Sequence, residues 1–245
     1  MGYKELLLDS STSLNPSQPT WSLPSSPYME MFKVLSVTIP GTFYGTGSQN
    51  DKVKFKTGTS TIYTANIPHG QYNITTFPSA LAAAMNDALS NGFTATYNDT
   101  TKQITIDGNA PFSILSLLSG TTAYRLIGSK KTDASVSSKT FTGNSIDLNG
   151  TNSIILTSNS LISRDSTYIN AQNSNCLALV PLTSPQNSLT YWVNPGGFLN
   201  VASECPYINL QLLDAQTMMS IDLRGASFQV SIGYTDDSDD PVTIS

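Results

Sequence analysis

Residues 29–41 read MEMFKVLSVTIPG and residues 228–234 read FQVSIGY. In the first stretch every second residue falls on one predicted face: Met29, Met31, Lys33, Leu35, Val37 and Ile39. In the second stretch the alternation is strict: Phe228, Val230, Ile232 and Tyr234 share a face. A period of two is typical of a strand that is buried on one side only. Both stretches therefore predict long strands of a half-buried sheet, the first ending at Pro40-Gly41.

Shorter apolar runs between turn signals predict further strands along the chain. They cover residues 53–56, 61–67, 93–97, 103–106, 153–157, 176–181, 189–193 and 207–213. About ten short strands with no repeat of fixed period indicate a β-sandwich or a barrel. Residues 112–118 are expected to form a single helical turn, and residues 129–152 to be mostly loop. With no linker visible after residue 27, residues 28–245 are expected to form one domain.

One segment has the spacing of a helix. Leu81, Met85 and Leu89 recur at i, i+4 and i+8, giving a narrow apolar stripe that can lie on a sheet. Thr76 is expected to cap its start, with Pro78 in the first turn. Asn91-Gly92 is expected to end it.

Residues 1–27 are expected to form an extended arm, because prolines at this density disfavour both helix and sheet ladders. These prolines are Pro16, Pro19, Pro24 and Pro27. The arm also carries apolar residues that a disordered tail rarely has, and these are the candidate interaction residues: Leu6, Leu7, Leu8, Trp21 and Leu23. We expect them to order the arm against a neighbouring molecule. A tail without a role is the alternative.

The composition is poor in charge. Charged residues make up 12% of the 245 residues, against about 25% in ordinary soluble proteins. With a net charge of −5, broad nucleic-acid binding is not expected, since it needs clustered cations. The densest basic spots are Lys52/Lys54/Lys56 and Arg125/Lys130/Lys131. Three alternating lysines are expected to keep one face of a strand in water rather than to bind phosphate.

Catalytic and metal-binding motifs are not found in the sequence, so we expect neither an enzyme nor a cofactor. His69 is the only histidine, and no Gly-x-Ser-x-Gly nucleophile motif is present. Cys176 and Cys205 lack the paired spacing of zinc ligands and are expected to be free, partly buried thiols, with a bridge as the alternative if their strands adjoin. The acidic run 236–240 lacks the Gly and the terminal Glu of a calcium loop.

Two weaker alternatives involve β-sandwich surfaces. Glu204 and Asp214 could meet as a carboxylate pair, although nothing in their spacing requires it. Tyr191, Trp192 and Phe198 could line a sugar-binding groove, although core and interface packing is the commoner use of such residues.

Targeting signals are not expected either. No stretch approaches 18 apolar residues, and the first six residues lack the apolar core of a signal peptide. A membrane span is not expected, and the product is expected to be cytosolic when it is made.

Several stretches of the chain resemble a known family in pattern and order: residues 34–44, 65–72 with the helix after them, 175–182, 207–214 and 221–228. From Tyr28 to Tyr234 the chain is similar to the jelly-roll penton and minor capsid proteins of virophages, polinton-like viruses and related large DNA viruses of the tectivirus–adenovirus lineage. The resemblance implies a single jelly-roll β-sandwich of 8–10 strands, with one short inserted helix and an N-terminal arm. It brings no catalytic residues.

The resemblance also implies a function. Five copies would close each fivefold vertex of an icosahedral capsid, in contact with the major capsid protein and other minor capsid proteins. The chain is too short for a major capsid protein of this lineage, which carries two jelly rolls, and this favours a penton. The alternatives are another minor capsid protein that bridges capsomers, and a carbohydrate- or receptor-binding β-sandwich.

Overall fold

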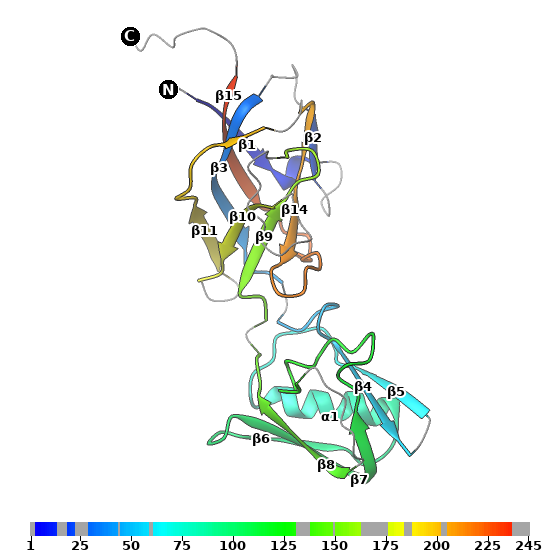
Figure 1. Cartoon of the computed structure of the whole chain (residues 1–245). Coiled ribbons are helices and arrows are strands. Elements are labelled where there is room, and N and C mark those ends of the chain that lie inside the picture. The colour runs from blue at the N-terminus through cyan, green and yellow to red at the C-terminus, as the bar shows by residue number, and fades with distance from the viewer. Residues whose placement is uncertain are drawn as a thin grey trace. The chain divides into compact units, whose positions relative to one another are not determined.

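The computed structural model describes residues 3–13, 19–22, 29–43, 45–58, 61–130, 138–148, 150–162, 176–183, 188–201 and 205–236. Within them the chain is mostly β-strand with one α-helix, as expected. It divides into two compact units: unit 1 comprises residues 1–43 and 151–245, and unit 2 comprises residues 44–150. The units are described separately (Figure 1).

Unit 1 contains a sheet built from both ends of the chain. Its strands are β1 (Lys4–Asp9), β15 (Gln229–Asp236), β3 (Met29–Pro40) and β11 (Leu189–Val193), in that spatial order. Each strand is antiparallel to its neighbour. The short strand β12 (Leu199–Asn200) also pairs with β3. The last strand therefore lies between the first and the third.

A second layer of unit 1 is formed by β10 (Cys176–Pro181), β9 (Ser153–Thr157) and β14 (Gln211–Asp214). β13 (Tyr207–Asn209) pairs with β2 (Thr20–Ser22) beside them. A single residue, Leu210, separates β13 from β14, and its N–H donates to the Pro19 carbonyl at 3.0 Å. β13 and β14 thus act as one kinked strand that connects β2 to β9.

The strand order of unit 1 is that of a jelly roll. With β13–β14 counted as one strand, the strands in chain order are β1, β2, β3, β9, β10, β11, β13–β14 and β15. The first sheet then runs first, eighth, third, sixth, and the second runs second, seventh, fourth, fifth. This is the two-sheet jelly-roll arrangement of eight strands. Unit 2 is inserted between the third and fourth of these strands.

One apolar core holds the two layers of unit 1 together. The sheet of β3 and β15 contributes Phe32, Val37 and Val230, all fully buried. The other layer contributes Leu156 and Val180, which are also fully buried. Because both layers supply side chains to one cluster, they pack face to face as a β-sandwich.

The arm expected over residues 1–27 differs from the structure. β1 pairs with β15 along its whole length, from Lys4 opposite Tyr234 to Asp9 opposite Gln229. β2 pairs with β13, and a short 3-10 helix, Ser10–Thr12, follows β1 directly. The reason is that apolar residues of this segment complete the core of its own chain. The single domain expected over residues 28–245 likewise differs from the two units, each with its own core.

A β-bulge changes the face predicted for β3. The pairing with β15 shifts between Ser231 and Ile232, which lie opposite Ser36 and Val34. Leu35 is the extra residue, and the alternation reverses on either side of it. Val37 and Ile39 are buried as predicted, but Phe32 and Val34 are buried in place of Met31 and Lys33. Met29 is buried as predicted, beyond a second register shift between Thr235 and Asp236.

Unit 2 is a five-stranded antiparallel sheet with one helix. Its strands are β5 (Thr61–Asn66), β4 (Lys52–Thr57), β7 (Gln103–Ile114) and β6 (Thr94–Asn98), with β8 (Ser138–Ser145) also on β7. Phe93 contacts Phe55 and Phe112 edge to face, with ring centroids 5.2 and 5.1 Å apart. The hairpin predicted around residues 98–101 joins β6 and β7. β7 ends at Ile114, inside the segment 112–118 that was expected to form a helical turn, and β8 lies in a region expected to be loop.

The predicted helix is α1 (Thr76–Ala88). Leu81 and Met85 are fully buried in the core of unit 2, and Leu89 packs against it. The cap differs from the prediction, because Asn73 Oδ1 accepts from the Thr75 and Thr76 N–H groups, each at 2.9 Å. Neither described helix has the length and apolar character needed to cross a bilayer.

Adjacent leucines on β1 test whether this strand belongs to the core. Leu8 is 5% exposed within the core of unit 1, whereas Leu7 is 69% exposed. We expect Leu8→Ala to lower the free energy of unfolding by about 2–5 kcal/mol, as for other buried leucines. The matched control Leu7→Ala should change it by less than about 0.5 kcal/mol. Denaturant unfolding of the dilute protein measures both, and equal effects would contradict the assignment of β1.

Unit 2 should fold when it is cut out of the chain. It has a separate core, and its ends meet: a Cβ built on Gly150 would lie 2.7 Å from the Gly45 Cα. We expect residues 44–150 alone to unfold cooperatively and Phe77→Ala to destabilise the fragment by about 3–5 kcal/mol. Circular dichroism during denaturation measures this. A fragment that is unfolded in buffer would contradict the independence of unit 2.

Candidate functional site

The interaction residues expected in an arm are mostly used within unit 1. Leu8 is buried in the core, and Leu6 and Trp21 are partly buried against it. The Trp21 Nε1–H also donates to Thr12 Oγ1 at 3.1 Å. Leu7 alone of the described four points outward, and Leu23 lies outside the described residues. Three of these residues therefore stabilise their own chain, and Leu7 remains a candidate for contact with another molecule.

An exposed apolar row lies on β11, at one edge of the first sheet (Figure 1). Leu189, Tyr191 and Val193 are 61%, 66% and 57% exposed. Between them Thr190 is buried and Trp192 packs against the core, as strand alternation requires. Three large apolar side chains thus stand side by side on the outer face of this strand.

Small polar residues continue the outer face of the sheet. Across from Tyr191 and Val193, β3 presents Thr38 and Ser36. Farther across lie Gln229 and Ser231 of β15, and then Asp9 and Leu7 of β1. We call the outer face of β1, β15, β3 and β11 the outer sheet face.

The carboxylates of β1 are hydrogen-bonded to β15. Gln229 Nε2 donates to Asp9 Oδ2 at 2.8 Å, and the Ser231 hydroxyl donates to Glu5. Hydrogen bonds from Gln229 and Ser11 lower the pKa of Asp9. At the other end of the strand the Tyr3 ring lies against Gly233 and contacts Phe198, with ring centroids 5.6 Å apart. Both acids of the strand are therefore engaged along the sheet.

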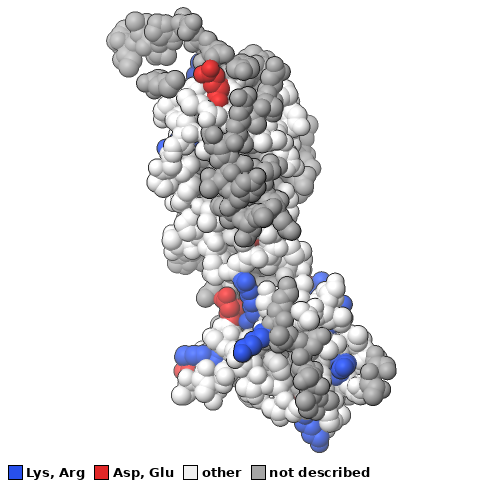
Figure 2. Space-filling view, viewed as in Figure 1, with Lys and Arg blue, Asp and Glu red and all other residues white. Residues whose placement is uncertain are grey.

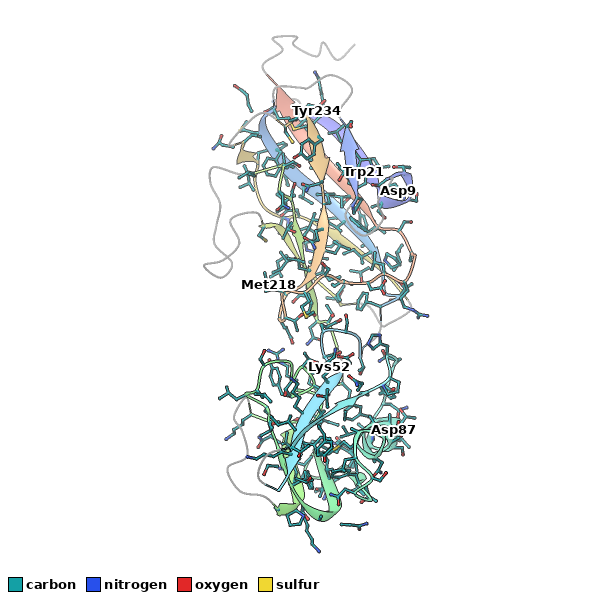
Figure 3. The ribbon with its side chains drawn as sticks, turned by 90° about the vertical axis from the view of Figure 1, so that its right-hand side faces the viewer. Asp9, Trp21, Lys52, Asp87, Met218 and Tyr234 are labelled. Atoms are coloured by element: carbon teal, nitrogen blue, oxygen red, sulfur yellow. The ribbon has the colours of Figure 1, made fainter. Side chains whose placement is uncertain are left out.

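Basic side chains are concentrated in unit 2. Eight of the 12 Lys and Arg residues lie in residues 44–150, and blue side chains are visible on that unit in Figure 2. Of the alternating lysines on β4, Lys52 pairs with Asp51 at 3.1 Å and Lys54 donates to the Ser119 carbonyl at 2.7 Å. These two cations are thus already neutralised or bonded, and Figure 3 labels Lys52 among the side chains of unit 2.

His69 belongs to a polar cluster rather than to a catalytic triad. Its Nε2 lies 3.0 Å from Asp51 Oδ2, and the Thr122 hydroxyl donates to the other oxygen of Asp51 at 3.4 Å. Asp51 therefore stands between the imidazole and the hydroxyl. In a catalytic triad the histidine hydrogen-bonds the nucleophilic hydroxyl directly. Here Asp51 lies between His69 and the Thr122 hydroxyl, so that contact is not made. The cluster joins the start of β4 to two loops of unit 2.

The other chemical candidates do not gather into a site. Asp214 is buried and accepts from the N–H groups of Gln216 and Thr217 at 2.9 and 2.7 Å, while Glu204 lies outside the described residues. Tyr191 and Trp192 face opposite sides of β11, so they do not form one sugar-binding surface with Phe198. No cluster of three or more metal-ligating side chains occurs among the residues that the structure describes. The acidic run after Asp236 is outside them.

The row on β11 was not singled out from the sequence as an interaction surface. Residues 189–193 read LTYWV, which alternates apolar and mixed residues on both faces. The sequence signal that could have revealed this surface is the complete lack of charged residues in residues 189–193. The structure adds that no described strand pairs with the outer side of β11.

Comparisons with known proteins show similarity to solved structures alone. No family model matches the chain, and no curated protein matches it. Among solved structures, the mavirus penton protein is similar over 96% of this chain and 100% of its own, at 8% identity and a TM-score of 0.48. These values are too low to transfer a function. The jelly-roll assignment of unit 1 therefore rests on its strand order.

The two thiols give a prediction about pH. Burial raises the pKa of both Cys176 and Cys205, so the folded state keeps them protonated at higher pH than the unfolded chain does. From about pH 8.5 upward the unfolded chain loses these protons first, and the free energy of unfolding should fall as the pH rises. We expect a shallower fall for Cys176→Ala/Cys205→Ala than for the wild type. Denaturant unfolding across the alkaline range measures both slopes, and identical slopes would contradict the burial of the thiols.

Proposed function

We propose that this protein is a structural capsid protein, and specifically a penton protein of which five copies close each fivefold vertex of an icosahedral particle. The observation that carries the proposal is the exposed, uncharged row Leu189, Tyr191 and Val193 on the edge of a jelly-roll sheet. Exposed apolar patches of this kind mark sites of association.

The jelly-roll fold limits the possible functions to a few classes but does not select one of them. Jelly rolls serve as capsid subunits, as lectins and as cupins, and a fold alone does not define a function. A cupin binds its ligand between the sheets, but here apolar side chains such as Phe32, Leu156 and Val180 fill that space. A lectin needs a gathered polar and aromatic site, and the three aromatic residues considered for one are dispersed. A packing unit fits the described surface best.

The proposal includes partners and a location. Its low charge, with 12% charged residues, suits wide contacts that lose water without leaving unpaired ions. The major capsid protein and other minor capsid proteins would surround the ring, and the protein would reside in the virion. Catalysis is not part of this role.

The mass of the purified protein in solution tests the proposal. Light scattering across a concentration series should show an oligomer of five times the chain mass of 26.2 kDa. A ring needs one patch to meet a different patch, so intermediates should be sparse once it closes. A stable dimer would contradict the penton. So would a protein that stays monomeric at every concentration, and saturable glycan binding that is lost in Tyr191→Ala would favour a carbohydrate-binding module instead.

A further inference from the structure

The edge strand β11 lacks the features that keep sheet edges apart. Natural edges carry lysine, proline, bulges or inward charges, because an open edge can pair with another chain. β11 has no charged residue and no proline, and no described strand pairs with its outer side. Leu189, Tyr191 and Val193 are all more than half exposed. Such an edge indicates a strand that another strand covers.

The opposite edge of the same sheet is β1, and it offers a matching surface. No described strand pairs with its outer side. Leu7 and Tyr3 are 69% and 52% exposed on the outer sheet face, the face that also carries Tyr191. Glu5 and Asp9 are held by β15, so Leu7 lies between two acids that already have partners.

Strand direction makes these two edges complementary. β1, β15, β3 and β11 are antiparallel from neighbour to neighbour, so β1 and β11 run in opposite directions. A second copy in the same orientation can therefore place its β1 beside β11 and continue the antiparallel ladder. The outer faces then coincide, and cross-strand contacts form between apolar residues of the two copies.

We propose that neighbouring copies of this chain join edge to edge, with β11 of one copy pairing with β1 of the next. The contact is head to tail, so it generates a ring when the rotation closes. This inference rests on the proposed ring of copies and names the surfaces that form it. Leu7 and Tyr3 on one side meet Leu189, Tyr191 and Val193 on the other.

The competing arrangement is a twofold contact of like with like. Two β11 strands, or two β1 strands, could also pair antiparallel. That contact occupies the same edge in both copies, so no further copy can add through it and the assembly ends at a dimer. The two arrangements differ in which cysteine pairs can form a disulfide between copies.

Disulfide trapping in the full chain separates them. The double variants Leu7→Cys/Tyr191→Cys and Leu7→Cys/Val193→Cys sample two registers of the proposed ladder. Under mild oxidation at least one should give a covalent series that ends at the pentamer on non-reducing gels. An equal mixture of Leu7→Cys and Tyr191→Cys (or Val193→Cys) should stop at covalent dimers, because each copy has one new thiol. The wild type, with its two native cysteines, gives the background.

Matched controls use the other sheet. Leu179 on β10 is 41% exposed and also large and apolar. Leu7→Cys/Leu179→Cys should give no series above the wild type. Tyr191→Glu should reduce the oligomer to monomer at concentrations where Leu179→Glu still assembles, since a buried unpaired charge opposes the contact.

The outcomes distinguish this inference from the proposed function. If the wild type forms the oligomer but neither double variant gives a series, the edge contact is overturned and the penton proposal stands. If Leu7→Cys or Tyr191→Cys alone gives covalent dimers in high yield, like edges meet and the edge contact is again overturned. If the wild type stays monomeric at its highest soluble concentration, both are overturned.

Discussion

The fold of unit 1 depends on the pairing of the last strand with the first and third. β15 lies between β1 and β3, in register from Gln229 opposite Asp9 to Tyr234 opposite Lys4. At the end of this ladder Ser10 and Phe228 exchange two hydrogen bonds, at 2.9 and 2.8 Å. Residues more than 200 positions apart are thus neighbours. Without this pairing, neither sheet order nor the jelly roll would form.

The strand pairing of unit 1 also leaves room for the insertion of unit 2 in the chain. The chain leaves unit 1 after Phe43 and returns at Thr151, between β3 and β9. A loop between strands of a jelly roll tolerates a long insertion when the ends of that insertion lie close together. Gly45 and Gly150 meet in this way, and the Gln71 side chain accepts from the Gly45 N–H at 2.9 Å. Unit 2 then needs only its own core.

The sequence was most informative where one local pattern decides the structure. The alternation at residues 228–234, the helix stripe with Leu81 and Met85, and the hairpin at residues 98–101 are confirmed. The bulge at Leu35 was missed because one extra residue leaves an apolar run almost unchanged. β1 was missed because its pairing with β15 is as long-range as the chain allows, and nearby prolines suggested an arm. The two units were missed because periodicity shows strands but not their partners.

The sequence could place only some of the residues of the interaction surface, because strand register is not visible in it. Leu7 is exposed and stays a candidate contact, but Leu6, Leu8 and Trp21 serve the core. Tyr191 was noted for a sugar-binding groove, yet its neighbours on the sheet make it part of an apolar row. Which face a residue occupies depends on register, and register depends on distant strands.

Amide hydrogen exchange, followed peptide by peptide in the dilute and the assembled protein, tests the central claim most directly. That claim is that β1 is an integral strand of a sheet whose two edges meet copies of the chain. We predict that β15 and β3 are protected in both states, that β1 is protected with them, and that β11 gains protection on assembly. Exchange of β1 at the rate of an unstructured peptide in both states, or of β11 at an unchanged rate after assembly, would contradict the account.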